Sequence, residues 1–266
     1  SVQEKQLTTL GKNIRALEVN GTFDDCQQLV KRAFADVELN KKHFLTSANS
    51  INIARWLSQQ FYYFFAFKQW PDKKNPPVIS VPSGNLGNIC AGILAECSGL
   101  PIKHMIAACN ANDVVTDFLQ SLIYKPKPAI ATMSNAMDVG DPSNFVRIRE
   151  IFGSDMPDIG DDLSSYSISD DETRATIKEV YSKYNYLLDP HGAVGYLALE
   201  LYLQENPGEK GIFLETAHPV KFYDAVEPVI GQKVPIPDSI RSILDLPKKS
   251  LKIEPDYEAL RAVLEK

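Results

Sequence analysis

Short apolar segments alternate with amphipathic ones along most of this chain, and that alternation restricts its fold more than any other feature. Runs of branched apolar residues predict strands at 13–19, 44–47, 78–82, 102–108 and 211–215. Helical patterns predict a helix opened by Thr22 and others at 51–70, 89–99, 113–122, 143–152, 170–184, 190–205 and 219–230. Strands separated by helices favour parallel pairing. The sequence therefore predicts the α/β class: a mainly parallel sheet covered by helices on both faces, with ligands at the carboxyl ends of its strands.

Two segments have patterns that place them in particular layers. The helix predicted at 51–70 is apolar on most of its sides, so we expect it inside the molecule, between layers. The polar stretch at 154–169 has few apolar anchors, so we expect it to be a surface connection.

Composition and charge exclude several classes of function. The 266 residues are 44% hydrophobic and 23% charged, which suits one or two domains with a substantial core. The formal net charge is −6 and no basic stripe is present, which argues against a nucleic-acid partner. The longest apolar run, at 61–67, is far shorter than the roughly 18 residues of a membrane span, and the amino terminus lacks signal-peptide features. We expect a cytoplasmic protein with no membrane partner.

The cysteines and histidines do not predict a metal site. The four cysteines have neither zinc nor redox spacing, and we expect them to be reduced, buried thiols. No two of the four histidines have the spacing of metal ligands. An imidazole can transfer protons near neutral pH, but His191 and His218 each stand at the start of a predicted helix, and we assign neither a catalytic role.

The loop at 83–88, Ser-Gly-Asn-Leu-Gly-Asn, lies between a predicted strand and a predicted helix. Two glycines allow the backbone to approach an anion closely, and the start of the helix directs free N–H groups at it. The spacing matches neither the nucleoside triphosphate loop nor the dinucleotide fingerprint. The loop therefore predicts a phosphate site that need not bind a nucleotide, although turn chemistry alone also explains such a sequence.

Four segments occur in a characteristic order: NSINIAR at 49–55, VPSGNLGN at 81–88, SNAMDV at 134–139 and TAHP at 216–219. They resemble motifs of the threonine synthases, pyridoxal-phosphate enzymes of the tryptophan synthase beta-like fold family. The opening SVQEKQ is similar to the segment that follows the family's small-domain glycine loop, so the resemblance covers nearly the whole chain. It implies an incomplete fold type II enzyme, with 1–76 as the remainder of the smaller domain and its connecting helix, and 77–266 as the large cofactor-binding domain.

The resemblance implies pyridoxal phosphate as cofactor and assigns residues to it. The loop would hold the cofactor phosphate mainly through backbone N–H groups, and the residue after the last predicted strand would place a hydroxyl at the pyridine nitrogen. A neutral hydroxyl does not stabilise a protonated pyridine, so it would reduce the capacity of the cofactor to accept electrons from the substrate. Capping of the next helix is the alternative role of this hydroxyl. The implied cofactor-binding residues are Gly84, Asn85, Leu86, Gly87, Asn88 and Thr216.

The resemblance also implies that Asn49 and Arg55 bind the phosphate of the substrate, O-phosphohomoserine. A leaving phosphate needs a guanidinium group and amide donors. Alternatively, Asn49 caps a helix and Arg55 is an ordinary solvent-exposed helix residue. Asp138 and Asn144 fall in a segment that lines the family's active site, but the sequence assigns neither a role.

The family's Schiff-base lysine is the one essential part that we do not find. The sequence Ala66-Phe67-Lys68 imitates its motif, but Gln69 stands where the motif has aspartate. We interpret Lys68 as a decoy and expect the catalytic lysine in a missing amino-terminal region of the same enzyme. No catalytic residue is therefore assigned within this chain.

The resemblance implies that the intact enzyme converts O-phosphohomoserine and water to threonine and phosphate, the last step of threonine biosynthesis. Two alternatives stay open. One is a serine or threonine dehydratase with the same cofactor loop, against which the SNAMDV and NSINIAR segments argue. The other is a non-catalytic homologue that binds phosphorylated small molecules, which the missing lysine favours.

Overall fold

A computed structural model describes residues 2–50, 52–153 and 159–266. The chain divides into two compact units, one formed by the residues up to Ser47 together with 235–266, the other by 48–234. This division differs from the predicted boundary at residue 76. The segment 48–76 joins the larger unit because its helix α4 (Ala54–Gln69) packs on α5 (Gly87–Cys97), and the carboxyl-terminal segment joins the smaller one.

The larger unit is built on a four-stranded sheet that is parallel throughout. The strand order is β4-β3-β2-β5, so the predicted α/β class with a parallel sheet is confirmed. Strand β2 lies between β3 and β5, and all five of its residues are buried. The strands are β2 (Val78–Pro82), β3 (His104–Cys109), β4 (Leu163–Ser167) and β5 (Gly211–Phe213).

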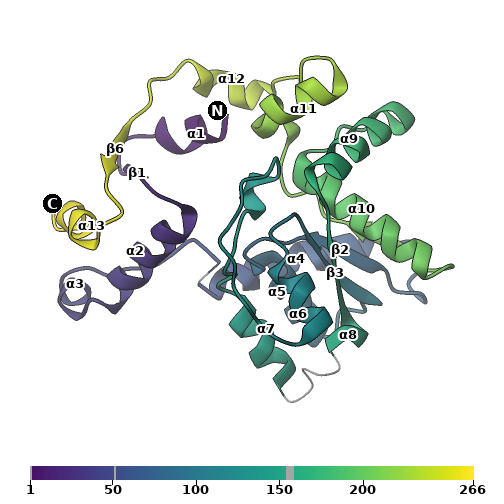
Figure 1. Cartoon of the computed structure of the whole chain (residues 1–266). Coiled ribbons are helices and arrows are strands. Elements are labelled where there is room, and N and C mark those ends of the chain that lie inside the picture. The colour runs from purple at the N-terminus through teal and green to yellow at the C-terminus, as the bar shows by residue number, and fades with distance from the viewer. Residues whose placement is uncertain (1, 51, 154–158) are drawn as a thin grey trace. The chain divides into compact units, whose positions relative to one another are not determined.

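Helices cover both faces of this sheet, as the alternating side chains of its strands require. Ile79 and Met105 point to the face covered by α5 and α6 (Val114–Ser121), while Val78 and Ile106 point to the opposite face. That opposite face is covered by α10 (Pro190–Glu205), with α9 (Asp170–Tyr184) packed against it (Figure 1). The core is therefore two apolar layers separated by the sheet.

Most predicted elements of the larger unit are confirmed. These are β2, β3, β5, α5, α6, α7 (Phe145–Phe152), α9 and α10; the helix predicted at 219–230 is a 3-10 turn, Pro219–Phe222, followed by α11 (Tyr223–Ile230). The prediction of a surface connection at 154–169 is wrong where the chain is described, because it contains α8 (Ile159–Asp162) and the edge strand β4. In β4 only Leu163 is buried, so its apolar signal is weak. Residues 154–158 of that prediction lie outside the described part.

The prediction that the helix at 51–70 lies inside, between layers, is also wrong. It is observed as α4, which buries only one side, through Trp56, Gln60 and Tyr63. Phe61 and Phe65 on its other side are 63% and 64% exposed. Because α4 packs mainly on α5, which itself covers the sheet, it forms an outer layer.

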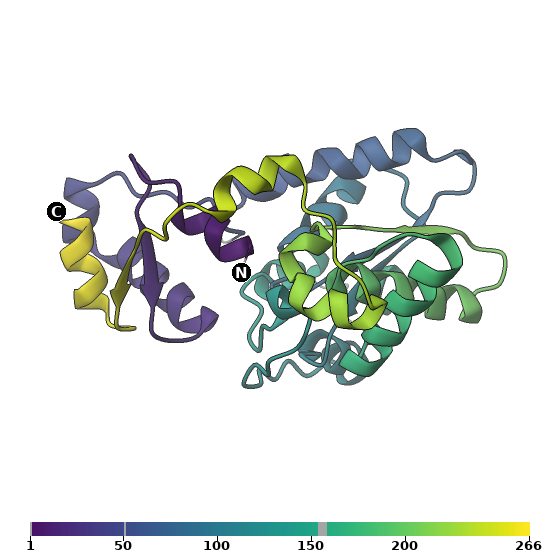
Figure 2. The same ribbon diagram turned by 90° about the horizontal axis from the view of Figure 1, so that it is seen from above.

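The smaller unit pairs the two ends of the chain (Figure 2). Strand β1 (Ala16–Val19) runs parallel to β6 (Ser250–Ile253), and helix α2 (Phe23–Ala35) packs against α13 (Tyr257–Leu264). As predicted, Thr22 opens α2, and it forms a reciprocal capping box with Asp25. The strand predicted at 44–47 is wrong: this segment is irregular, and Phe44 is 97% exposed. The other elements of this unit are α1 (Val2–Thr8), α3 (Val37–Lys42) and α12 (Asp238–Leu244).

Candidate functional site

The topology of the larger unit places a site at the carboxyl end of β2. The chain runs from β2 to β3 and β4 on one side, and then crosses to β5 on the other side of β2. Open parallel sheets bind ligands where the strand order reverses in this way. The loop at 83–88 follows β2, and Thr216 follows β5, whose neighbour Leu214 donates its N–H to the Ser80 carbonyl over 3.0 Å. The two predicted ends of the cofactor site therefore meet at one edge of the sheet.

The loop at 83–88 presents backbone donors to that edge. Leu86 has a left-handed φ of 61°, and α5 begins directly after it at Gly87. Within the part of the chain that the structure describes, the N–H groups of residues 84 to 88 donate no hydrogen bond. A row of free N–H groups at the positive end of an eleven-residue helix suits a phosphate.

Both glycines of the loop are needed for close contacts. A Cβ built on Gly84 would lie 2.6 Å from Met137 Cα, and one on Gly87 would lie 2.5 Å from Ser50 Cβ. The first contact brings the loop against the SNAMDV segment, and the second brings it against the NSINIAR segment. Three of the four resembling segments therefore meet here.

Asn85 and Asn144 tie the loop to the segment that begins with Asn49. The Asn85 side chain donates to Ser50 Oγ over 3.1 Å and accepts from the backbone N–H of Ser143 over 2.7 Å. Asn144, which is fully buried, donates both to Ser50 Oγ at 3.0 Å and to the Asn85 carbonyl at 2.7 Å. The sequence assigned Asn144 no role. The structure shows that it connects the NSINIAR segment with the loop at 83–88.

The Asn88 side chain serves the structure of the loop. Its Oδ1 accepts a hydrogen bond from the Tyr63 hydroxyl at 2.9 Å and another from Tyr62. Burial raises the pKa of Tyr62 to about 12 and raises that of Tyr63 well above its usual value, so both phenols stay protonated and donate. The side-chain oxygen of Asn88 is thus engaged, while its backbone N–H stays available to a ligand.

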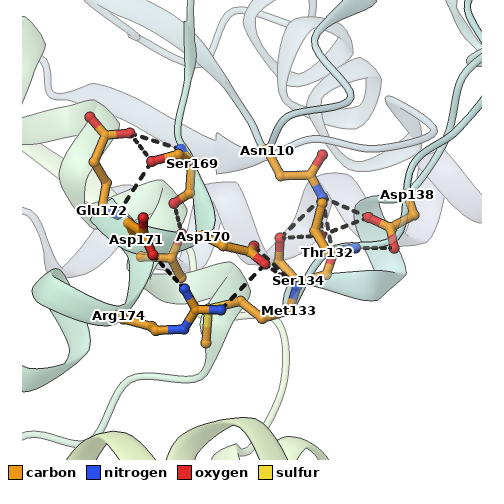
Figure 3. A network of polar contacts seen from close by, with 11 residues as sticks. Asn110, Thr132, Met133, Ser134, Asp138, Ser169, Asp170, Asp171, Glu172 and Arg174 are labelled. Atoms are coloured by element: carbon orange, nitrogen blue, oxygen red, sulfur yellow. Dashed lines mark hydrogen bonds and ion pairs between the residues drawn. The ribbon is translucent and has the colours of Figure 1, made fainter.

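The SNAMDV segment is shaped by the carboxylate of Asp138 (Figure 3). Asp138 accepts from the backbone and the hydroxyl of Thr132 at 3.0 and 2.7 Å, and from the Asn110 amide at 3.0 Å. Asn110 directly follows β3, so this network fixes the segment to the carboxyl edge of the sheet. Asp138, which the sequence left without a role, organises the turn that packs on Gly84.

Asn49 and Arg55 lie on either side of Ser50 in sequence, and Arg55 is the second residue of α4. Asn49 Oδ1 accepts the Ser50 N–H over 2.6 Å, and the exposed guanidinium of Arg55 donates to the Ala48 carbonyl. Because Ser50 contacts Asn85, both residues lie on the segment that borders the loop. Arg55 keeps further N–H donors for an anion, since one guanidinium carries five.

Thr216 is exposed, and its hydroxyl makes no hydrogen bond with the described residues. It does not cap the following 3-10 turn, where His218 instead accepts from the backbone N–H of Val220 over 3.1 Å. The free Thr216 hydroxyl follows β5, and the free N–H groups of the loop follow the neighbouring strand β2. Such a pair suits the two ends of pyridoxal phosphate, with the hydroxyl at the pyridine nitrogen and the N–H groups at the phosphate.

Two family models match the chain, and together they decide its relationship. One, described as "Pyridoxal-phosphate dependent enzyme", matches residues 2–214, and the other, "Threonine synthase, C-terminal", matches residues 192–264. This chain belongs to the pyridoxal-phosphate dependent enzymes. The cofactor predicted from the resemblance, pyridoxal phosphate, is thereby confirmed.

The resemblance to threonine synthases is confirmed as well. The chain is 47% identical to a threonine synthase of Haemophilus influenzae and 45% identical to that of Escherichia coli, and these matches cover 99% of the chain. The Escherichia coli crystal structure superposes with a TM-score of 0.92, and a structure titled as pyridoxal-phosphate-bound threonine synthase from Brucella melitensis with 0.86, at 44% and 33% identity. The fold type II assignment is thus confirmed. The chain spans about 61% of the length of the curated relatives it matches.

Three further observations concern classes of site considered from the sequence. No helix among the described residues is long and apolar enough to cross a membrane. In the same residues, no three histidine, cysteine or acidic side chains cluster closely enough to hold a metal ion. The four cysteines are free thiols; Cys90 and Cys109 are buried as predicted, but the prediction of burial is wrong for Cys97, which is exposed, and Cys26 is half-buried.

Proposed function

We propose that this chain is the cofactor-binding part of a threonine synthase, which converts O-phosphohomoserine and water to threonine and phosphate. The observation that carries the proposal is that two segments suited to bind anions lie next to each other. The free N–H groups of the loop at 83–88 and the segment with Asn49 and Arg55 are joined through Ser50. A reaction with a phosphorylated cofactor and a phosphorylated substrate needs two neighbouring phosphate sites.

In this proposal each part of the site has one task. The backbone N–H groups of Gly84, Asn85, Leu86, Gly87 and Asn88 hold the cofactor phosphate. Thr216 donates or accepts at the pyridine nitrogen without adding charge, and Asn49 and Arg55 bind the substrate phosphate that departs. When bound, pyridoxal phosphate supplies the electron sink that delocalises the carbanions of the substrate.

The catalytic lysine is proposed to come from the part of the enzyme that this chain does not span. Lys68 is exposed near the end of α4, thirteen residues after Arg55. At 1.5 Å per residue it lies roughly 20 Å along the helix from the substrate segment. This position supports its interpretation as a decoy. We also retain the cytoplasm as the proposed location.

The two alternatives make different products. A dehydratase releases a 2-oxo acid, and a non-catalytic binder releases nothing. Maize serine racemase shares the fold at a TM-score of 0.51 but only 15% identity, a likeness that concerns the fold alone. The SNAMDV segment contacts Gly84 and the NSINIAR segment contacts Gly87. Because both segments resemble threonine synthase motifs, these contacts favour the synthase.

The test is made on the enzyme with the length of its relatives. Arg55→Ala should raise KM for O-phosphohomoserine by roughly tenfold to a hundredfold, because a charge-assisted hydrogen bond contributes roughly 1.5 to 3 kcal/mol. Lys68→Ala should leave threonine and phosphate formation unchanged. Formation of a 2-oxo acid instead of threonine would reject the proposal, and so would loss of the borohydride-trapped cofactor adduct in the Lys68→Ala protein.

A further inference from the structure

The start of α10 carries a buried ionisable pair that the proposed chemistry does not use. Asp189 is completely buried and caps the helix by accepting the His191 backbone N–H over 2.9 Å. The same carboxylate oxygen lies 2.6 Å from His191 Nδ1, and the His191 side chain is only 4% exposed. Its ring packs on Phe222 with the centroids 4.6 Å apart.

The second nitrogen of this imidazole contacts a backbone donor. His191 Nε2 lies 3.2 Å from the N–H of Ala136. A backbone N–H can only donate, so Nε2 accepts, and the ring proton must lie on Nδ1, where Asp189 accepts it. The carboxylate therefore selects the neutral tautomer that can hold Ala136.

Ala136 belongs to the 3-10 turn Asn135–Met137, and this turn is the surface on which the phosphate loop rests. Gly84 approaches Met137 so closely that no side chain fits between them. We propose that His191, oriented by Asp189, is a positioning residue: by holding the N–H of Ala136 it sets the turn against Gly84 and so fixes the loop that binds the cofactor phosphate. This inference rests on the proposed function of that loop.

Glu215 connects the same pair to the other end of the site. The carboxyl group of Glu215 stands beside Asp189, over Gly192, and in its protonated form it can donate to the buried Asp189 Oδ2, which accepts no other hydrogen bond from the described residues. Desolvation of its carboxyl group and the adjacent Asp189 raise the pKa of Glu215 to about 9, so the two acids do not repel each other at neutral pH. Glu215 directly precedes Thr216. The group formed by Asp189, His191 and Glu215 therefore supports both the phosphate end and the pyridine end of the cofactor site.

Two substitutions at one position separate this role from simple stability. In His191→Gln, the amide oxygen reaches the place of Nε2 and can accept from Ala136. In His191→Asn, the side chain ends near the place of Nδ1 and can serve only Asp189. Titration of this chain with pyridoxal phosphate, followed by absorbance, should give a Kd about fivefold to tenfold weaker for the Asn variant and within about twofold of wild type for Gln.

A second measurement needs no cofactor. Hydrogen exchange at the Ala136 amide should be slow in wild type and His191→Gln, and at least tenfold faster in His191→Asn. Imidazole ¹⁵N shifts of the unsubstituted protein should show a protonated Nδ1 and an unprotonated Nε2. The opposite tautomer would overturn the inference even if the Asn variant does not fold.

The outcomes distinguish this inference from the function on which it rests. Equal Kd values for wild type and both folded variants would refute the positioning role while leaving the cofactor site intact. A wild-type chain that binds no pyridoxal phosphate would refute the proposed cofactor site; the exchange rates would then still decide whether His191 holds the turn.

Discussion

Arg147 donates from Nη1 to the backbone carbonyl of Ser50 over 2.8 Å, across almost a hundred residues of sequence. The same nitrogen lies 3.0 Å from Asn144 Oδ1, and the guanidinium carbon stands 4.8 Å from the centre of the Trp56 ring. The planar guanidinium of Arg147 thus connects α7 with the start of α4 and with the buried Asn144 amide, which in turn binds the loop at 83–88. Arg147 thus holds the segment with Asn49 at the Ser50 carbonyl, next to Asn85 of the loop at 83–88.

Arg147→Lys should lower the free energy of unfolding by about 1 to 3 kcal/mol, because an ammonium group cannot reproduce the planar guanidinium contacts. Both tryptophans, Trp56 and Trp70, lie in the unit formed by 48–234, so tryptophan fluorescence during urea unfolding reports on that unit. The matched control is Arg149→Lys, an exposed position on the same helix, where the change should stay within about 0.5 kcal/mol. Equal effects at both positions would contradict the proposed bridge.

Gly84→Ala tests the contact between the loop and the turn. The added methyl group would meet the Met137 backbone, which cannot move aside as a flexible side chain can. We expect a loss of about 1 to 3 kcal/mol in stability and weaker binding of pyridoxal phosphate. Gly160→Ala in α8, where nothing lies within 4 Å of the new Cβ, is the control and should be neutral or slightly stabilising. A Gly84→Ala protein with unchanged Kd would show that the loop does not rest on the turn.

The sequence predicted the larger unit well because its signals are local. Apolar runs such as Val78–Pro82 become fully buried strands, and a strand, a glycine loop and a helix in succession restrict where a ligand binds. The strand β4 was missed because an edge strand with one buried residue has almost no apolar signal. The helix α4 was placed too deeply because its aromatic residues give no amphipathic face, although only one side of it is covered.

The proposed cofactor and substrate segments were predicted through resemblance, but the residues that join them were not. Asn144 and His191 act through partners 59 and 55 residues distant in sequence, namely Asn85 and Ala136. A buried hydrogen-bond partner so far along the chain leaves no periodic or spacing pattern in a single sequence. The smaller unit was incompletely predicted for the same reason, since β6 pairs with a strand more than 200 residues earlier.

Glu215→Gln should change how stability depends on pH. Desolvation of its carboxyl group and Asp189 raise the pKa of Glu215 from 4.5 to about 9, so between these values the folded state keeps a proton that the unfolded state has released. The contribution of Glu215 to the free energy of unfolding is therefore fully present below pH 4.5 and is lost as the pH rises toward 9. The free energy of unfolding of wild type minus that of Glu215→Gln should decline steadily from pH 5 to pH 9. Glu179→Gln, at an exposed position of α9, should give a flat difference, and a flat difference for Glu215→Gln would mean that this acid is ionised in the folded protein.

Thr216 offers the most direct test of the pyridine end of the site, because its hydroxyl has no partner among the described residues and the residue is exposed. Thr216→Val removes the hydroxyl at nearly constant volume, so stability without cofactor should change by less than about 0.5 kcal/mol. Binding of pyridoxal phosphate should weaken roughly threefold to tenfold, the value of one hydrogen bond, and Thr216→Ser should restore it. Inorganic phosphate separates the two ends of the site, since it occupies only the loop at 83–88. Its affinity should be the same in wild type and Thr216→Val; a parallel loss for phosphate and pyridoxal phosphate would place Thr216 at the phosphate end and reverse the orientation of the cofactor.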